Sequence, residues 1–108
     1  HLIRKIVIST GVVTTLAGGS RGSADITYPH GITTDGTNLY VADTTNYLIR
    51  KIVISTGAVT TVAGTGSSGS ANGTGTSASF NLPYGITIDG TKLYVADFSN
   101  HLIRKIVL

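Results

Sequence analysis

Short apolar runs, each bounded by turn-forming residues, recur along the whole chain. In its central part, four such runs are predicted as strands: Gly31–Thr34, Leu39–Asp43, Leu48–Ser55 and Val59–Ala63. These runs are rich in Val, Ile, Thr and Tyr, which favour strands. The Asp35-Gly36 pair between the first two is a tight-turn signal. Short strands joined by tight turns predict an antiparallel meander in an all-β fold. We refer to the four strand positions, in order, as A, B, C and D.

The predicted strands are apolar on both faces. Because successive side chains of a strand point to opposite faces, Tyr40 and Ala42 in strand B lie on one face. Leu39 and Val41 lie on the other, and strand C shows the same two-sided pattern. A sheet that is apolar on both faces must be covered on both. We therefore expect each sheet to be packed between two neighbours.

A tandem repeat underlies this pattern. The segment Leu-Ile-Arg-Lys-Ile-Val occurs three times, at Leu2–Val7, Leu48–Val53 and Leu102–Val107. The similarity extends beyond this segment, since 18 of 25 residues are identical between residues 30–54 and residues 84–108. Near-identical units of this kind are built to stack against one another.

The repeat divides the chain into one complete unit and two partial ones. Residues 1–29 carry strands C and D of one repeat, residues 30–83 carry a complete repeat, and residues 84–108 carry strands A, B and C of the next. A repeat of about 40–50 residues with four strands is typical of a β-propeller blade. We therefore expect nine strands, or about two blades per chain.

Composition narrows the class of protein without naming a ligand. Hydrophobic residues make up 41% of the 108 residues, and the absence of cysteine excludes disulfides and cysteine-based metal sites. Six of the eight basic residues are the Arg-Lys pairs of the repeat, so the net charge of +3 does not predict a nucleic-acid surface. No apolar run approaches the roughly 18 residues of a transmembrane helix. The Thr-, Ser- and Gly-rich, Lys-poor composition favours an extracellular or cell-surface protein of a bacterium.

Several motifs resemble those of the NHL-repeat family. The residues Asn100-His101-Leu102 spell the motif for which that family is named, and the earlier copy reads Asn46-Tyr47-Leu48. The surrounding segments Gly85–Asp89, Leu93–Asp97 and Asn100–Lys105 closely resemble the family pattern. The resemblance implies a four-stranded propeller blade with strand A nearest the axis, usually in a six-bladed ring. It also implies binding roles, including protein and RNA partners, although a few six-bladed relatives are hydrolases or lyases with an axial metal.

About two blades cannot close a ring, so apolar faces and open edges are expected at both ends of the chain. Three chains could assemble into a six-bladed ring, or copies could stack head to tail into an open filament. A third alternative is that the chain is a piece of a longer array. Strand C occurs at both ends, so the chain has one strand more than two blades need. Three explanations of this extra strand are open: it is swapped, it is displaced, or it results from where the segment is cut.

The paired basic residues of strand C, Arg50 and Lys51, must point to opposite faces. We expect each to lay its alkyl stem along the seam between blades and to carry its charge to the rim. The alternative is that Arg50 pairs with the carboxylate of Asp43.

The carboxylates are predicted to be structural. Asp35 and Asp89 stand in Asp-Gly turns, where Asp bonds nearby backbone amides. Asp43 and Asp97 begin Asp-x-x-Asn turns and are expected to cap them in the same way. The sequence contains no Asp-x-Asp-x-Asp-Gly calcium loop.

The loops from strand D to strand A, Gly19–Pro29 and Thr65–Pro83, are the most variable segments, and such loops carry most recognition. The candidate binding surface consists of aromatic and basic residues in or near these loops: His30, Tyr84, Phe98, Arg21 and Phe80. Phe80 is also expected to plug against the neighbouring blade, a place that Ile26 and Tyr28 take in the shorter loop. Gly64–Gly69 lacks the Lys and the following helix of a phosphate loop, so we predict a linker there.

The histidines are predicted to be packing residues. His1 and His101 occupy the repeat position of Tyr47, and His30 occupies that of Tyr84. A position that accepts either His or Tyr is more simply amphipathic packing than a metal ligand. We therefore expect no metal, cofactor or catalytic residue. If three chains assemble around a common axis, three copies of His30 would lie near the mouth of that axis and could bind a metal or an anion.

Three functions follow, in order of preference. The first is a non-enzymatic scaffold that self-associates through blade faces and strand edges. The second is a propeller module that binds protein or glycan through the loops from strand D to strand A. The third is a metal-dependent hydrolase or lyase at an axial channel. Fold alone does not decide among them.

Overall fold

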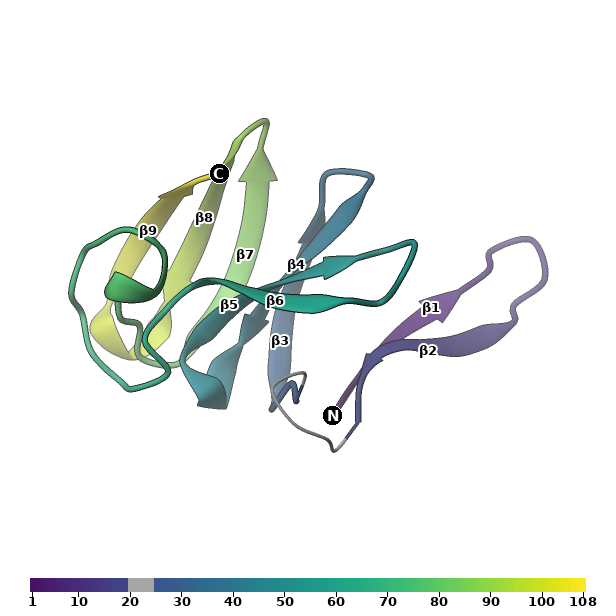
Figure 1. Ribbon diagram of the computed structural model, residues 1–108, viewed down its shortest axis with the longest axis horizontal. Coiled ribbons are helices and arrows are strands. Elements are labelled where there is room, and N and C mark those ends of the chain that lie inside the picture. The colour runs from purple at the N-terminus through teal and green to yellow at the C-terminus, as the bar shows by residue number, and fades with distance from the viewer. Residues whose placement is uncertain (20–24) are drawn as a thin grey trace.

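The computed structural model describes residues 1–19 and 25–108, which form an all-β fold (Figure 1). Each strand pairs antiparallel with the next, in three sheets of two, four and three strands. The strands are β1 (Leu2–Ile6), β2 (Val13–Gly18), β3 (Pro29–Thr34), β4 (Asn38–Asp43), β5 (Leu48–Val53), β6 (Val59–Ala63), β7 (Pro83–Asp89), β8 (Lys92–Asp97) and β9 (Leu102–Val107). The described residues also form three single-turn 3-10 helices: η2 (Thr44–Asn46), η3 (Gly75–Ser77) and η4 (Phe98–Asn100). The predicted all-β architecture of antiparallel propeller blades is confirmed, and the chain holds part of a propeller.

The turn between β3 and β4 is organised by Asp35, as predicted. Its Oδ1 accepts hydrogen bonds from the backbone N–H groups of Asn38 at 2.7 Å and Thr37 at 2.9 Å. These two bonds, the Asn38 bond first, lower the pKa of the Asp35 carboxyl to about 2. Gly36 occupies the left-handed region with φ of 93°, which the tight turn requires.

Strand β5 ends at Val53, two residues before the predicted end. The chain reverses there because the Val53 N–H donates to the Ala58 carbonyl at 2.9 Å and the Val53 carbonyl accepts from the Gly57 N–H at 2.7 Å. Gly57 has φ of 75°, so glycine permits the reversal. The apolar pattern continues past Val53, and it therefore overstated the length of the strand.

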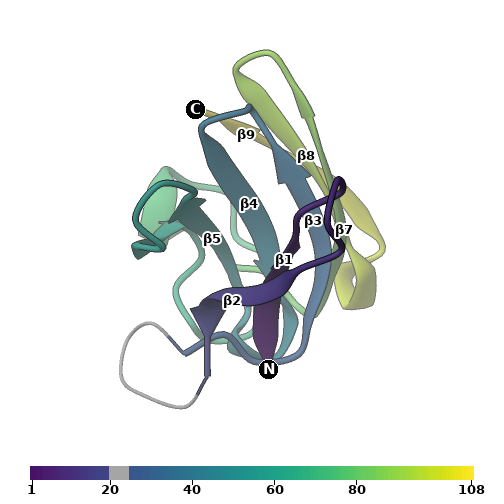
Figure 2. The ribbon, with the colours of Figure 1, turned by 90° about the vertical axis from the view of Figure 1, so that its right-hand side faces the viewer.

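The four-stranded sheet β3–β6 is packed between the other two sheets (Figures 1 and 2). On one side Tyr40, Ala42 and Ile49 join a core cluster with Leu93 and Val95 of β8. On the other side the cluster contains residues from β1, β2, β4 and β5: Ile3, Ala17, Val41 and Ile52. The predicted division of strands B and C into two apolar faces is confirmed. None of the helical turns in the described ranges is long and apolar enough to cross a membrane.

Each loop from strand D to strand A inserts one large apolar side chain between two sheets. Phe80 is 1% exposed in one cluster and Ile26 is 2% exposed in the other, which agrees with the plugging role expected of both. Tyr28, which was also expected to fill this place, is 56% exposed and does not. The longer loop is a folded segment rather than the predicted linker. Its backbone is tied together by the bond from the Gly69 N–H to the Phe80 carbonyl at 3.1 Å and that from the Gly64 N–H to the Gly75 carbonyl at 3.2 Å.

The innermost strands of neighbouring sheets, β3 and β7, lie side by side (Figure 2). A Cβ atom added to Gly31 in β3 would overlap the carbonyl oxygen of Tyr84 and lie 2.9 Å from the amide nitrogen of Ile86. Both neighbours are backbone atoms, which cannot move aside independently. Glycine is therefore required where the two strands approach.

We predict that Gly31→Ala destabilises the chain by about 1–3 kcal/mol, because the new methyl group is forced against backbone. The matched control is Gly85→Ala, since Gly85 occupies the same repeat position in β7 but its added Cβ would meet only the Ala96 side chain, at 3.7 Å. Urea denaturation of both variants at low protein concentration measures the difference. Equal stability of the two variants would show that β3 and β7 do not approach as described.

Candidate functional site

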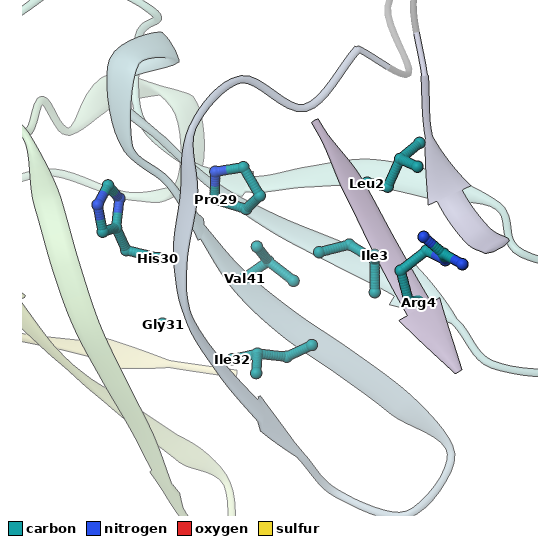
Figure 3. Close-up of a pocket in the computed structure, with 8 residues that line it drawn as sticks. All are labelled: Leu2, Ile3, Arg4, Pro29, His30, Gly31, Ile32 and Val41. Carbon is teal, nitrogen blue, oxygen red and sulfur yellow. The ribbon is translucent and has the colours of Figure 1, made fainter. Parts of the chain in front are cut away.

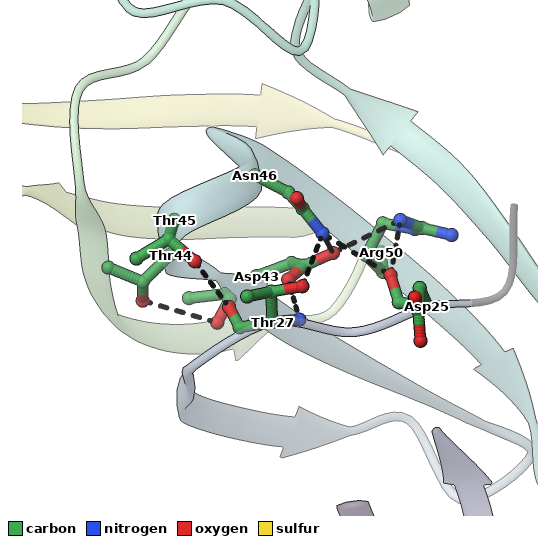
Figure 4. Close-up of polar contacts among 8 residues, drawn as sticks. Asp25, Thr27, Asp43, Thr44, Thr45, Asn46 and Arg50 are labelled. Carbon is green, nitrogen blue, oxygen red and sulfur yellow. Dashed lines mark hydrogen bonds and ion pairs between the residues drawn. The ribbon is translucent and has the colours of Figure 1, made fainter. Parts of the chain in front are cut away.

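A buried Asp, a buried Arg and a half-buried Asn occur together in the second sheet (Figure 4). Asp43, at the end of β4, is fully buried, and its Oδ2 accepts hydrogen bonds from Arg50 and from Asn46, each at 3.0 Å. Its Oδ1 accepts from the backbone N–H of Thr27 at 2.7 Å, in the loop before β3. The carboxylate therefore balances the charge of the buried Arg50 and also fixes the loop that joins the first sheet to the second.

The third sheet repeats this Asp–Asn–Arg triad. Asp97 is fully buried, and its Oδ2 accepts from Arg104 at 2.7 Å and from Asn100 at 2.8 Å. Its Oδ1 accepts from the backbone N–H of Asn81 at 2.8 Å, in the loop before β7. The two loops differ in length and sequence, yet the triad binds each of them through the same carboxylate oxygen.

Arg104 has further contacts that bind it to the long loop. Its guanidinium donates to the carbonyl oxygens of Ser79 and Ala71, both at 2.9 Å, and to Oδ1 of Asn72 at 3.0 Å. It also lies over the ring of Phe80, with Cζ 4.9 Å from the ring centroid. Arg104 therefore ties strand β9 to the long loop.

These triads correct two predictions. Arg50 does not carry its charge to the rim, because it is buried and forms an ion pair with Asp43; the alternative pairing is confirmed. Asp43 and Asp97 do not cap the turns that follow them, because their carboxylates bind the preceding loops instead. Asn46 and Asn100 had no predicted role, although the constant spacing Asp-x-x-Asn-x-x-x-Arg in both repeats is a signal that could have identified them.

The third arginine of the repeat, Arg4 in β1, is in a different environment. It is exposed, and no ion pair joins it to any described carboxylate. Beside it runs a groove of about 290 Å³ between β1 and the second sheet (Figure 3). The groove is lined by Leu2, Ile3, Arg4, Pro29, His30, Gly31, Ile32 and Val41. In the other two sheets strand B borders strand C, whereas the first sheet of the described residues has only β1 and β2 and leaves that edge of β1 open.

Three of the predicted binding residues form an aromatic row. The rings of His30 and Tyr84 have centroids 4.2 Å apart at 69°, and those of Tyr84 and Phe98 are 4.8 Å apart at 66°. Such edge-to-face packing is favourable for aromatic rings. Nδ1 of His30 lies 3.0 Å from Oγ1 of Thr44, which donates to the Pro83 carbonyl at 2.6 Å. A shallow depression beside the row is lined by His30, Gly31, Tyr84 and Gly85.

The other two predicted binding residues do not join this row. Phe80 is buried in the core, so it cannot present a binding surface, and Arg21 lies outside the described residues. Within residues 1–19 and 25–108, no cluster of three or more His, Cys, Asp or Glu residues could hold a metal ion. The aromatic row is therefore the part of the predicted surface that the fold brings together.

The two ends of the chain expose side chains that are buried in the middle sheet. Ile49 of β5 is 0% exposed, whereas its counterpart Ile103 of β9 is 76% exposed. Ile52 of β5 is 0% exposed, whereas its counterpart Ile6 of β1 is 61% exposed. The same side chain at the same repeat position is thus covered in the middle and uncovered at one end. The two exposed faces differ from each other. The exposed face of β9 corresponds to the side of the middle sheet that carries Ile49, and the exposed face of β1 corresponds to the side that carries Ile52.

We predict that Arg50→Met destabilises the chain by about 3–5 kcal/mol, because it leaves the fully buried carboxylate of Asp43 without its cation. The matched control, Arg4→Met, removes the exposed arginine at the same repeat position and should cost less than about 0.5 kcal/mol. Urea denaturation followed by circular dichroism gives both values. A small effect at Arg50 would mean that the triad does not hold the loop.

The sequence is similar to curated proteins that carry NHL repeats. No protein-family model matches the sequence. NHL repeat-containing protein 2 of Bos taurus is 34% identical over 126 residues, covering 98% of this chain and 17% of that protein. NHL repeat-containing protein 2 of Gallus gallus is 38% identical over 83 residues, covering 75% of this chain and 11% of that protein. The chain spans less than a fifth of the length of these curated relatives.

Two solved structures are also similar to this chain. A structural genomics protein of unknown function from Bacteroides thetaiotaomicron is 32% identical with a TM-score of 0.84, over 98% of this chain and 30% of that one. An auxiliary nutrient binding protein from the same organism is 25% identical with a TM-score of 0.72, over 96% of this chain and 31% of that one. The repeated motif, the antiparallel blades and these similarities together show that the chain belongs to the NHL-repeat family.

Proposed function

We propose that this NHL-repeat segment is a non-enzymatic scaffold that self-associates through the faces and edges at its two ends. The observation that supports this most directly is the exposure of Ile103, at 76%, against 0% for its counterpart Ile49. A blade apolar on both faces needs a neighbour on each side, and the two end sheets have a neighbour on one side only. Association of copies supplies the missing neighbours.

The two ends expose several large apolar side chains. On the outward face of β9 they are Ile103 and Val107. At the end formed by β1 and β2 they are Leu2, Ile6, Val7 and Val13. Contiguous apolar patches on a soluble protein mark interaction surfaces. Since the two patches differ, their contact is head to tail, and such a contact gives a ring when it closes and a filament when it does not.

The length of the solved relatives supports a ring of three copies. The chain covers 30% of one and 31% of the other, so three copies correspond to nearly the whole length of such a protein. Three chains of about two blades each also agree with the six-bladed ring that the sequence resemblance implied.

A second function, the binding of a protein or glycan, is favoured by the similarity to an auxiliary nutrient binding protein. The row formed by His30, Tyr84 and Phe98 is the surface that would serve it, because Phe98 is 59% exposed and aromatic rings offer large, rigid contact area. An extracellular or cell-surface location suits this second function as well as the first.

We predict that the 108-residue chain has a solution mass above its 11.1 kDa at micromolar concentration. Ile103→Asp should weaken association at least roughly tenfold, since it removes a large apolar contact and places a charge in the interface. The control is Val12→Asp: Val12 is 53% exposed, and its counterpart Ala58 is exposed although the middle sheet is covered on both sides. Light scattering measures all three proteins. A monomeric wild-type chain, or equal loss in both variants, would contradict the proposal.

A further inference from the structure

We propose that Asn72 is a site of self-modification, at which the side-chain amide is lost and an aspartyl carboxylate forms against Arg104. Asn72 and Gly73 are both exposed to solvent and lie in the long loop between β6 and β7 (Figure 1). Asparagine is a chemically labile residue, and a glycine after it leaves the attacking backbone nitrogen unhindered by any side chain. The sequence has one Asn-Gly pair, and the fold places it beside a buried cation.

Arg104 orients the side chain of Asn72. Its Nη2 lies 3.0 Å from Oδ1 of Asn72 and 2.9 Å from the carbonyl oxygen of Ala71. A guanidinium only donates hydrogen bonds, so the amide atom that faces it must be the oxygen and not the nitrogen. The group that leaves in the reaction, Nδ2, is therefore not the group that Arg104 holds.

Water is the one co-reactant that the conversion needs. The backbone nitrogen of Gly73 loses its proton to water and bonds to Cγ of Asn72. The bond from Cγ to Nδ2 then breaks, and Nδ2 takes up a proton and leaves as ammonia. One water molecule opens the cyclic imide at either of its two carbonyl groups, which gives aspartate or isoaspartate at position 72. No atom is oxidised or reduced.

The position of Arg104 favours the attack on Cγ. As the Gly73 nitrogen approaches, negative charge develops on Oδ1 of Asn72, the atom that accepts from the guanidinium. A donor that is already aimed at the atom where charge develops lowers the barrier of such a step. Arg104 is held in place, because Nη1 donates to Asp97 at 2.7 Å and to the Ser79 carbonyl at 2.9 Å, and the residue is 8% exposed.

The loop fixes the chain around the reacting pair and leaves the nucleophile free. The Ala71 N–H donates to Oγ of Ser79 at 2.9 Å, and the Ser79 N–H donates to the Ala71 carbonyl at 3.0 Å. By contrast, no hydrogen bond among residues 1–19 and 25–108 engages the N–H of Gly73. A Cβ atom at Gly73 would lie 3.0 Å from the carbonyl carbon of Ser77, so the tight path of the loop favours glycine here.

The product binds Arg104 more strongly than the starting amide does. A hydrogen bond between two charged groups is roughly twice as strong as one between neutral groups. The new carboxylate would be a second anion beside the guanidinium, in addition to Asp97. The modification therefore lowers the net charge of +3 by one and ties the long loop more firmly to β9.

The asparagines of the two triads are oriented differently and serve as internal controls. Asn46 and Asn100 present Nδ2 to the carboxylates of Asp43 and Asp97. Each is followed by a large residue, Tyr47 or His101, which hinders attack by the backbone nitrogen. We expect neither to react on the time scale of Asn72.

Peptide mapping by mass spectrometry tests the proposal. The folded chain and a synthetic peptide of residues 69–77 are incubated together at the same slightly alkaline pH, with freshly prepared samples as the zero point. We expect Asn72 to convert about tenfold faster in the folded chain, because only there does a charged donor bind its oxygen. Conversion in the folded chain that is no faster than in the peptide would overturn the proposal, since the fold would then give Asn72 no activation.

Arg104→Lys and Arg50→Lys form a matched pair of variants. Each keeps a cation near the buried Asp of its triad, but the single amino group of a lysine cannot reach both Asp97 and Asn72. Once circular dichroism shows both variants folded, Arg104→Lys should convert Asn72 about tenfold more slowly than wild type, and Arg50→Lys at the wild-type rate. Equal rates in the two variants would contradict the role of Arg104. If Arg104→Lys does not fold, the comparison of the folded wild type with the peptide still decides the proposal.

Discussion

Every blade in this chain is apolar on both faces, and this requirement for two neighbours governs the rest of the structure. The middle sheet meets it, with Ile49 covered on one side and Ile52 on the other. The end sheets meet it on one side only, which explains why identical isoleucines range from fully buried to 76% exposed. Whether an isoleucine of the repeat is buried therefore depends on the place of its sheet in the stack and not on the residue type. The proposed self-association follows from the same requirement, since another copy can supply the missing neighbours.

The buried charges serve this stacking by fixing the loops that fill the seams. Asp43 and Asp97 each use one carboxylate oxygen for the Arg and Asn of their own blade and the other for a loop N–H. The loops then place Ile26 and Phe80 between the sheets. An isolated buried carboxylate would be costly, but here its partners satisfy both oxygens. Each triad thus connects its own blade to the loop whose apolar side chain fills the space between two blades.

Local features of the fold were predictable from the sequence, and long-range partners were less so. The alternation of Tyr40 and Ala42 with Leu39 and Val41 predicts the two faces of β4, because it depends only on the pleat of a strand. The partner of Asp43 in the loop depends on the path of residues 25–28, for which no repeat pattern exists. Phe80 was predicted both as a plug and as a binding residue, and only its burial decides between these roles. The row of His30, Tyr84 and Phe98 forms because strands β3 and β7 lie side by side, a contact between repeats that periodicity within one repeat cannot show.

The three copies of Leu-Ile-Arg-Lys-Ile-Val show that a repeated strand acquires its role from its neighbours. Arg50 and Arg104 are buried because a strand that ends in Asp lies beside them, whereas Arg4 has a groove in that place. The sequence of the strand is the same in each case, so the difference in burial among the three arginines comes from what surrounds them. Repetition thus supplies identical strands, and the placement of the carboxylates decides which of them are held by a buried ion pair.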